Sequence, residues 1–113
     1  EELKYIGTLC VEYFIDRNDN LYVNEIAPRV HNSGHLTINA YNVSQFENHV
    51  RAVCSLDQVP LKKISNAEMT NLIGNQIIPY RENLKINDNQ FLFDYLKKDI
   101  KEKRKMGHLT TLK

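Results

Sequence analysis

Two β-prone runs separated by a short polar turn constrain the fold of this chain more than any other feature of its sequence. Residues 5–16 and 21–27 are rich in β-branched and aromatic side chains, and residues 17–20 (Arg-Asn-Asp-Asn) are turn formers. Pro28 ends the second run because it has no backbone N–H to donate to a strand ladder. The pattern predicts an antiparallel hairpin that stops at Pro28.

The predicted hairpin places two carboxylates opposite each other. A two- or four-residue loop gives the pairs Asp16 with Leu21, Phe14 with Val23, and Glu12 with Glu25. Like charges about 5 Å apart at Cβ repel each other, whereas a pair of hard oxygen ligands suits Mg²⁺. A metal ion held by Glu12 and Glu25 is therefore one interpretation. The alternatives are two solvated side chains that repel weakly, or a one-residue bulge that breaks the register.

A polar loop and a short helix follow the hairpin. Residues 29–42 contain a dense group of hydrogen-bonding side chains, which are Arg29, His31, Asn32, Ser33 and His35. Such a loop suits an anion or a hydrogen-bonding heterocycle, and a solvent-exposed polar loop is the alternative. A nucleophilic Ser33–His35 pair is a weaker hypothesis because no residue supplies the orienting acid. Ser44 with Glu47 predicts a capped helix, whose apolar stripe, predicted to pack in a core, is Phe46, Val50, Val53 and Cys54.

The second half of the chain is predicted to contain two strands and a helix. The predicted elements are a strand over 68–74, a short helix over 88–98 and a final strand over 106–112. The two cysteines, Cys10 and Cys54, have no metal-ligand spacing and are expected to be reduced, buried thiols. No apolar run is long enough to span a bilayer. Because the chain starts with Glu1 rather than Met, we expect it to be part of a longer protein.

Positive charge is concentrated at the C-terminal end. Residues 97–113 contain seven Lys/Arg and two Asp/Glu, whereas residues 1–96 contain eight Lys/Arg and twelve Asp/Glu. A basic segment indicates an anionic partner, such as nucleic acid or a phosphate-bearing metabolite, or simply a solvated surface. The absence of aromatic residues among these cations weakens a base-stacking interpretation.

The run NEIAPRVHNSGH at 24–35 resembles the signature of the N5-carboxyaminoimidazole ribonucleotide synthetases. These enzymes are the ATPase subunit of phosphoribosylaminoimidazole carboxylase and belong to the ATP-grasp superfamily. Further matches follow in the family's order, and these are GTLCVEYF at 7–14, SQFENHVRAV at 44–53, MTNLIG at 69–74 and KRKMGHLT at 103–110. The family's YGK-like run is matched only loosely, by Tyr95-Leu96-Lys97-Lys98.

The resemblance implies an α+β fold in two parts. Residues 1–62 would form the C-terminal part of an ATP-grasp domain, with antiparallel strands and a packed helix, and residues 63–113 a small β-rich domain. It implies a cytoplasmic, homodimeric parent ligase of purine biosynthesis that binds neither membrane nor nucleic acid. That enzyme would use ATP and bicarbonate to carboxylate 5-aminoimidazole ribonucleotide through carboxyphosphate. The present chain alone is expected to be inactive.

The resemblance also implies roles for individual residues. Glu12 and Glu25 match the ligands of Mg²⁺ (or Mn²⁺), and Asn24 lies beside Glu25 in the ATP site. Arg29 matches a catalytic residue that steadies carboxyphosphate. The residues matched to substrate binding are His31, Asn32 and Ser33 for the aminoimidazole ribonucleotide, and Lys98, Arg104 and Lys105 for its 5′-phosphate. Two alternatives stay open, which are a non-catalytic nucleic-acid-binding module and a sister ATP-grasp ligase with another substrate.

Overall fold

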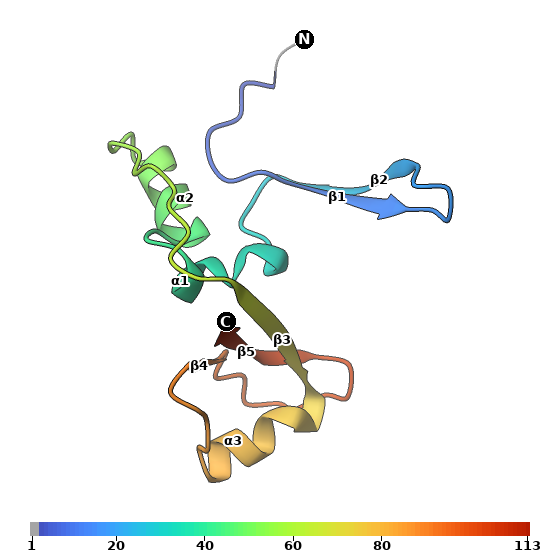
Figure 1. The fold of residues 1–113 in the computed structure, drawn as a ribbon, viewed down its shortest axis with the longest axis vertical. Coiled ribbons are helices and arrows are strands. Elements are labelled where there is room, and N and C mark those ends of the chain that lie inside the picture. Colours follow the sequence, from blue (N-terminus) through green and yellow to red (C-terminus); the bar gives the residue numbers. More distant parts are fainter. Residues whose placement is uncertain (1–2) are drawn as a thin grey trace. The chain divides into compact units, whose positions relative to one another are not determined.

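The fold is α+β, as predicted. The computed structural model describes residues 3–113, which contain two antiparallel sheets and several short helices (Figure 1). The chain divides into two compact units, Glu1–Lys62 and Lys63–Lys113. Among the described residues, no helix has the length and apolar character that a membrane crossing requires.

The first unit begins with the predicted hairpin. Strands β1 (Cys10–Ile15) and β2 (Leu21–Ala27) pair antiparallel (Figure 1). The connecting turn is closed by the Asp16 carboxylate, which accepts hydrogen bonds from the backbone and side chain of Asn20 at 2.9 Å each. These bonds, the side-chain one first, hold the pKa of Asp16 below its usual value. Asp19 adopts φ 61°, a left-handed conformation that Asp tolerates in tight turns.

A bulge changes the register of the hairpin. The predicted Glu12–Glu25 pair is confirmed, but the predicted pairs Phe14–Val23 and Asp16–Leu21 are wrong. The observed pairs are instead Tyr13 with Val23, Phe14 with Tyr22, and Ile15 with Leu21. The register shifts because Asn24 is an extra residue on β2 between the partners of Glu12 and Tyr13.

One face of this hairpin is entirely apolar. It carries three cross-strand pairs, Val11 with Ile26, Tyr13 with Val23, and Ile15 with Leu21, and we call these six side chains the apolar hairpin face. Their exposed fractions range from 36% to 67%. The opposite face carries Glu12 and Glu25. The hairpin therefore separates an uncovered apolar surface from a charged one.

Three short helical elements complete the first unit. They are the 3₁₀ turn η1 (Asn32–Gly34), α1 (Thr37–Ala40) and α2 (Gln45–Val53). Ser44 caps α2 as predicted, because its side chain accepts a hydrogen bond from the Glu47 N–H at 3.1 Å.

The apolar stripe of α2 does not pack in a core. Phe46, Val50 and Val53 are 38–52% exposed, and Cys54 is also exposed, so the prediction of core packing and of two buried thiols is wrong here. The stripe has the period of a packed helix face, but within the described residues it is left largely uncovered. The buried apolar residues of this unit are the smaller Ala27, Ala40 and Val43.

The second unit is a three-stranded sheet with one covering helical segment. Strands β3 (Ala67–Ile73), β4 (Gln90–Asp94) and β5 (Lys105–Leu112) have the antiparallel order β3-β5-β4. The predicted strands over 68–74 and 106–112 are confirmed. The predicted helix over 88–98 is wrong, because Gln90–Asp94 alternates between more and less exposed side chains and pairs with β5.

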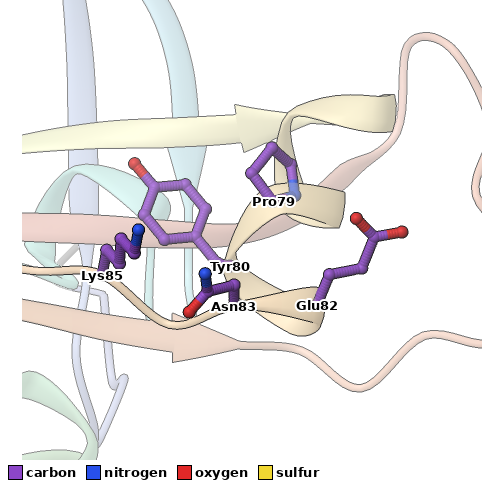
Figure 2. A pocket seen from close by; sticks show the side chains of 5 residues that line it. All are labelled: Pro79, Tyr80, Glu82, Asn83 and Lys85. Carbon is purple, nitrogen blue, oxygen red and sulfur yellow. The ribbon is translucent and has the colours of Figure 1, made fainter.

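The helical segment of this unit connects β3 to β4 in the sequence. It consists of η2 (Gly74–Ile77) and α3 (Ile78–Glu82) (Figure 1). Ile77 packs with Leu72 and Met106 in the buried core. An open cleft of about 430 Å³ lies along α3, lined by Pro79, Tyr80, Glu82, Asn83 and Lys85, with Glu82 and Lys85 at opposite ends of the row (Figure 2). It contains none of the residues that the sequence predicted to be functional.

Candidate functional site

The first unit gathers most of the predicted site residues on the charged face of the hairpin. The carboxylates of Glu12 and Glu25 and the imidazole of His31 each offer one ligand atom, and these three atoms lie within 4.8 Å of one another. The bulge brings Asn24 to the same place, because its amide donates to Glu12 Oε2 at 3.2 Å. The sequence resemblance placed Asn24 beside Glu25 in an ATP site, which stays a prediction.

Each carboxylate has one partner from the loop that follows β2. The Arg29 guanidinium donates to Glu25 Oε1 at 3.3 Å, and His31 Nε2 lies 3.2 Å from Glu12 Oε1. Arg29 is 60% exposed at its side chain, whereas His31 is only 13% exposed. Arg29 is therefore held by an exposed ion pair, which is weak in water, while His31 is fixed by its surroundings.

The Ser33 side chain faces the other nitrogen of the His31 ring. Ser33 Oγ lies 2.8 Å from His31 Nδ1, and the Ser33 backbone N–H donates to the same nitrogen at 3.3 Å. When Nδ1 accepts these bonds, the ring proton is on Nε2 and points at Glu12. When Nδ1 instead donates to Ser33 Oγ, the Nε2 lone pair is available to a metal ion. Ser33 thus pairs with His31.

A glutamine that sequence analysis did not single out holds this loop in place. Gln45 Oε1 accepts the His31 backbone N–H at 3.0 Å, and Gln45 Nε2 donates to the His31 carbonyl at 2.7 Å and to His35 Nδ1 at 2.7 Å. A Cβ at Gly34 would lie 2.5 Å from Gln45 Oε1, so a larger residue there would displace the Gln45 amide from its present position. Gln45 is the first residue of α2, and no pattern in a single sequence shows that its side chain contacts the backbone of a distant loop.

The donor set fits a hard divalent cation. Two carboxylates face each other at a separation that is unfavourable for like charges, and oxygen ligands of this kind are those that Mg²⁺ and Mn²⁺ prefer. The amide of Asn24 and the ring of His31 supply further polar atoms at the same place. The geometry therefore supports Glu12 and Glu25 as candidate metal ligands, as expected from the sequence.

The basic candidates lie in the second unit and differ in how they are held. Arg104 is half-buried and donates to the Asp99 carbonyl at 3.3 Å, while Lys98 and Lys105 are exposed. Lys97, which was not among the predicted residues, is half-buried, and its Nζ donates to the Lys105 carbonyl at 2.7 Å. Of the two neighbouring lysines, the structure therefore fixes Lys97 beside the start of β5 and leaves Lys98 in solvent.

Comparison with known proteins finds relatives of both units. Residues 1–46 match the ATP-grasp domain, and residues 67–113 match the phosphoribosylaminoimidazole carboxylase C-terminal domain. The N5-carboxyaminoimidazole ribonucleotide synthase of Bacillus subtilis (strain 168) is 42% identical over 113 residues, a stretch that covers all of this chain and 30% of the relative.

Solved structures lead to the same family. The N5-carboxyaminoimidazole synthetase of Staphylococcus aureus superposes with a TM-score of 0.87 at 43% identity, over 96% of this chain and 30% of the other. The Aspergillus clavatus synthase, in complex with ADP and 5-aminoimidazole ribonucleotide, gives 0.82 at 36% identity, over 95% and 30%. The chain belongs to the N5-carboxyaminoimidazole ribonucleotide synthase family.

The backbone conformation bears on which of the two lysines is held. In the run Tyr95-Leu96-Lys97-Lys98, expected from the sequence to match a YGK-like run only loosely, Leu96 adopts φ 53°, a conformation that favours glycine. With Leu96 at the position of a glycine, the lysine of such a run is Lys97, and its assignment stays a prediction. The chain spans about 30% of the length of the synthases that it matches.

Proposed function

We propose that this chain contributes the metal-binding and acceptor-binding part of an ATP-dependent carboxylating ligase. The reaction would join bicarbonate to the exocyclic amine of 5-aminoimidazole ribonucleotide through carboxyphosphate, with release of ADP and phosphate. The observation that carries the proposal is the cluster of Glu12, Glu25 and His31, with Asn24 and Arg29 bonded to it. Family membership and the ligands of the Aspergillus clavatus relative support the same reaction.

Glu12 and Glu25 would hold Mg²⁺ or Mn²⁺. These cations, when bound, supply charge neutralisation for the ATP phosphates. Asn24 orients the Glu12 carboxylate through its 3.2 Å hydrogen bond, which leaves the other oxygen of Glu12 facing His31. The bulge at Asn24 is therefore a functional feature of the hairpin, because it aims a third polar side chain at the same point.

Arg29 is suited to steady the carboxyphosphate dianion. Its guanidinium is planar and always charged, and its exposed 3.3 Å contact with Glu25 can be exchanged for a bidentate contact with an anion at little cost. His31 and Ser33 can hold or pass a proton at Nε2 and Oγ, and we assign both side chains to binding of the acceptor. Asn32 is the remaining residue of the loop assigned to acceptor binding.

The basic residues of the second unit would bind the 5′-phosphate of the ribonucleotide. Arg104 offers a planar fork that fits a phosphate, and Lys97 offers a point charge held close to the same backbone. Lys98 and Lys105 add positive charge from exposed positions. This assignment accounts for the concentration of cations at residues 97–113 without any nucleic-acid partner.

The test uses a chimera in which this chain replaces the matching 30% of the Bacillus subtilis synthase. We expect ADP release that requires ATP, bicarbonate and 5-aminoimidazole ribonucleotide together. The 113-residue chain alone is expected to be inactive, because phosphoryl transfer needs both sides of the nucleotide site. A soluble, folded chimera without this activity would contradict the proposal. We further propose that the parent ligase acts in the cytoplasm as a homodimer and does not bind nucleic acid.

A further inference from the structure

An ion pair outside the proposed site joins α3 to the end of β4. Arg81 Nε donates to Asp94 Oδ2 at 2.7 Å, and Arg81 NH2 donates to Asp94 Oδ1 at 2.7 Å. The pair is bidentate, and the two side chains are only 29% and 18% exposed. Hydrogen bonding to Arg81 holds the pKa of Asp94 below its usual value. Such a pair is better ordered than an ordinary surface ion pair.

The same two side chains also bind the segment that follows β4. Asp94 Oδ1 accepts the Leu96 backbone N–H at 2.8 Å, and Arg81 NH2 donates to the Lys97 carbonyl at 3.2 Å. The first of these peptide groups precedes Leu96 and the second follows Lys97, so the two bonds enclose Leu96, the residue with φ 53°. The Arg81–Asp94 pair thus holds the chain in a conformation that costs a non-glycine residue about 1–2 kcal/mol.

The residue with the positive φ buries little of its own side chain. Leu96 is 81% exposed, and Lys98 and Asp99 are also exposed. What the turn does fix is Lys97, whose Nζ donates to the Lys105 carbonyl at 2.7 Å and lies 5.2 Å from the centroid of the Tyr95 ring. The turn therefore fixes the position of the Lys97 ammonium rather than adding an apolar side chain to the core.

We propose that Arg81 and Asp94 are positioning residues that hold the Lys97 ammonium ready to bind the phosphate monoester of the substrate. This inference rests on the proposed function, because that function supplies the phosphate. A lysine ammonium has three N–H donors, and the Lys105 carbonyl takes one of them. Ordering the lysine before binding removes part of the side-chain entropy that it would otherwise lose when the phosphate binds.

The test compares Asp94→Asn with Glu68→Gln as a matched control. Glu68 forms an ion pair with Lys113 at 2.7 Å in the same unit, away from the 95–98 turn. NMR relaxation on the 113-residue chain should show increased mobility at residues 95–98 in Asp94→Asn, with wild-type values in Glu68→Gln. Unchanged relaxation in Asp94→Asn would overturn the inference.

Kinetics in the chimera supply the functional readout. We expect Asp94→Asn to raise KM for 5-aminoimidazole ribonucleotide about tenfold, and KM for ATP and kcat to stay within twofold of the unsubstituted chimera. Lys97→Ala should show the same split, and adding Asp94→Asn to it should cause little further change. If the unsubstituted chimera is active and Asp94→Asn leaves KM for 5-aminoimidazole ribonucleotide unaltered, the positioning role is overturned and the proposed function stands. An inactive unsubstituted chimera would overturn the proposed function and, with it, this inference.

Discussion

Replacing Gln45 by Glu tests how the loop of the candidate site is held. Gln45 accepts one hydrogen bond from the backbone of His31 and donates one to it, and it donates another to His35. Glutamate has the same shape and can still accept the His31 N–H. It cannot make the two donations at 2.7 Å, so a carboxylate oxygen would face the His31 carbonyl.

The expected loss is about 2–4 kcal/mol. The lost bond to His35 is worth about 1 kcal/mol, and the partly buried His31 carbonyl left without a donor costs about 1–3 kcal/mol. A change of that size corresponds to about 30- to 1,000-fold faster opening of the loop, since 1.4 kcal/mol is a factor of ten. Hydrogen exchange of the backbone amides at 31–35 in the 113-residue chain measures this opening directly.

Gln58→Glu provides the control, because it makes the same chemical change at an exposed residue of the same unit. The Gln58 amide donates one long hydrogen bond, to the Leu56 carbonyl at 3.4 Å. Its exchange rates at 31–35 should equal those of the wild type. Equal rates in Gln45→Glu and wild type would refute the reasoning that the amide of Gln45 holds the loop. Equal acceleration in both variants would assign the effect to added negative charge.

Three further outcomes are expected. Glu25→Gln should leave the Tm of the metal-free chain unchanged or slightly higher, because it relieves carboxylate repulsion. We expect Mn²⁺ to broaden the NMR signals of residues 10–15 in the wild type and not in Glu25→Gln. Leu96→Gly should raise the free energy of unfolding by up to about 1 kcal/mol in urea titrations, whereas Leu84→Gly, at an exposed position without positive φ, should not. The pKa of Asp94 is lowered on folding, so its ionised form stabilises the folded chain. The difference in stability between wild type and Asp94→Asn should reach its full size above about pH 4 and disappear as the pH falls through the lowered pKa. Thermal unfolding measured against pH tests this, and a pH-independent difference would contradict it.

The hairpin illustrates what the sequence could predict. Alternating β-prone residues around a polar turn were enough for both strands and for the Glu12–Glu25 pair. The register beyond that pair was not predictable, since a bulge at Asn24 depends on local geometry rather than on composition. The loop at 16–20 has five residues rather than two or four, and the extra residue at Asn24 offsets this difference, so the register returns to the predicted one at the carboxylates.

The region 75–98 illustrates where prediction failed. A short apolar run such as Phe91-Leu92-Phe93 fits helix and strand almost equally well, and the strand formed because β5 offers a free edge on that side. Gln45 and the Arg81–Asp94 pair were missed for a related reason. Each acts through contacts between residues that are 13 or 14 positions apart, and such contacts are invisible to periodicity.

The uncovered apolar surface of the hairpin bears directly on the chemistry of its other face. Burying an aliphatic or aromatic side chain completely is worth about 1.5–3 kcal/mol. The six side chains of the apolar hairpin face are 36–67% exposed, so roughly half of that stabilisation, on the order of 5–9 kcal/mol in total, is not realised in this chain. That amount is comparable to the whole stability of a small domain, and a two-stranded hairpin alone is marginal in water. The Glu12–Glu25 repulsion is therefore imposed on a hairpin with much exposed apolar surface, and we infer that covering this surface would fix the placement of the two carboxylates more firmly.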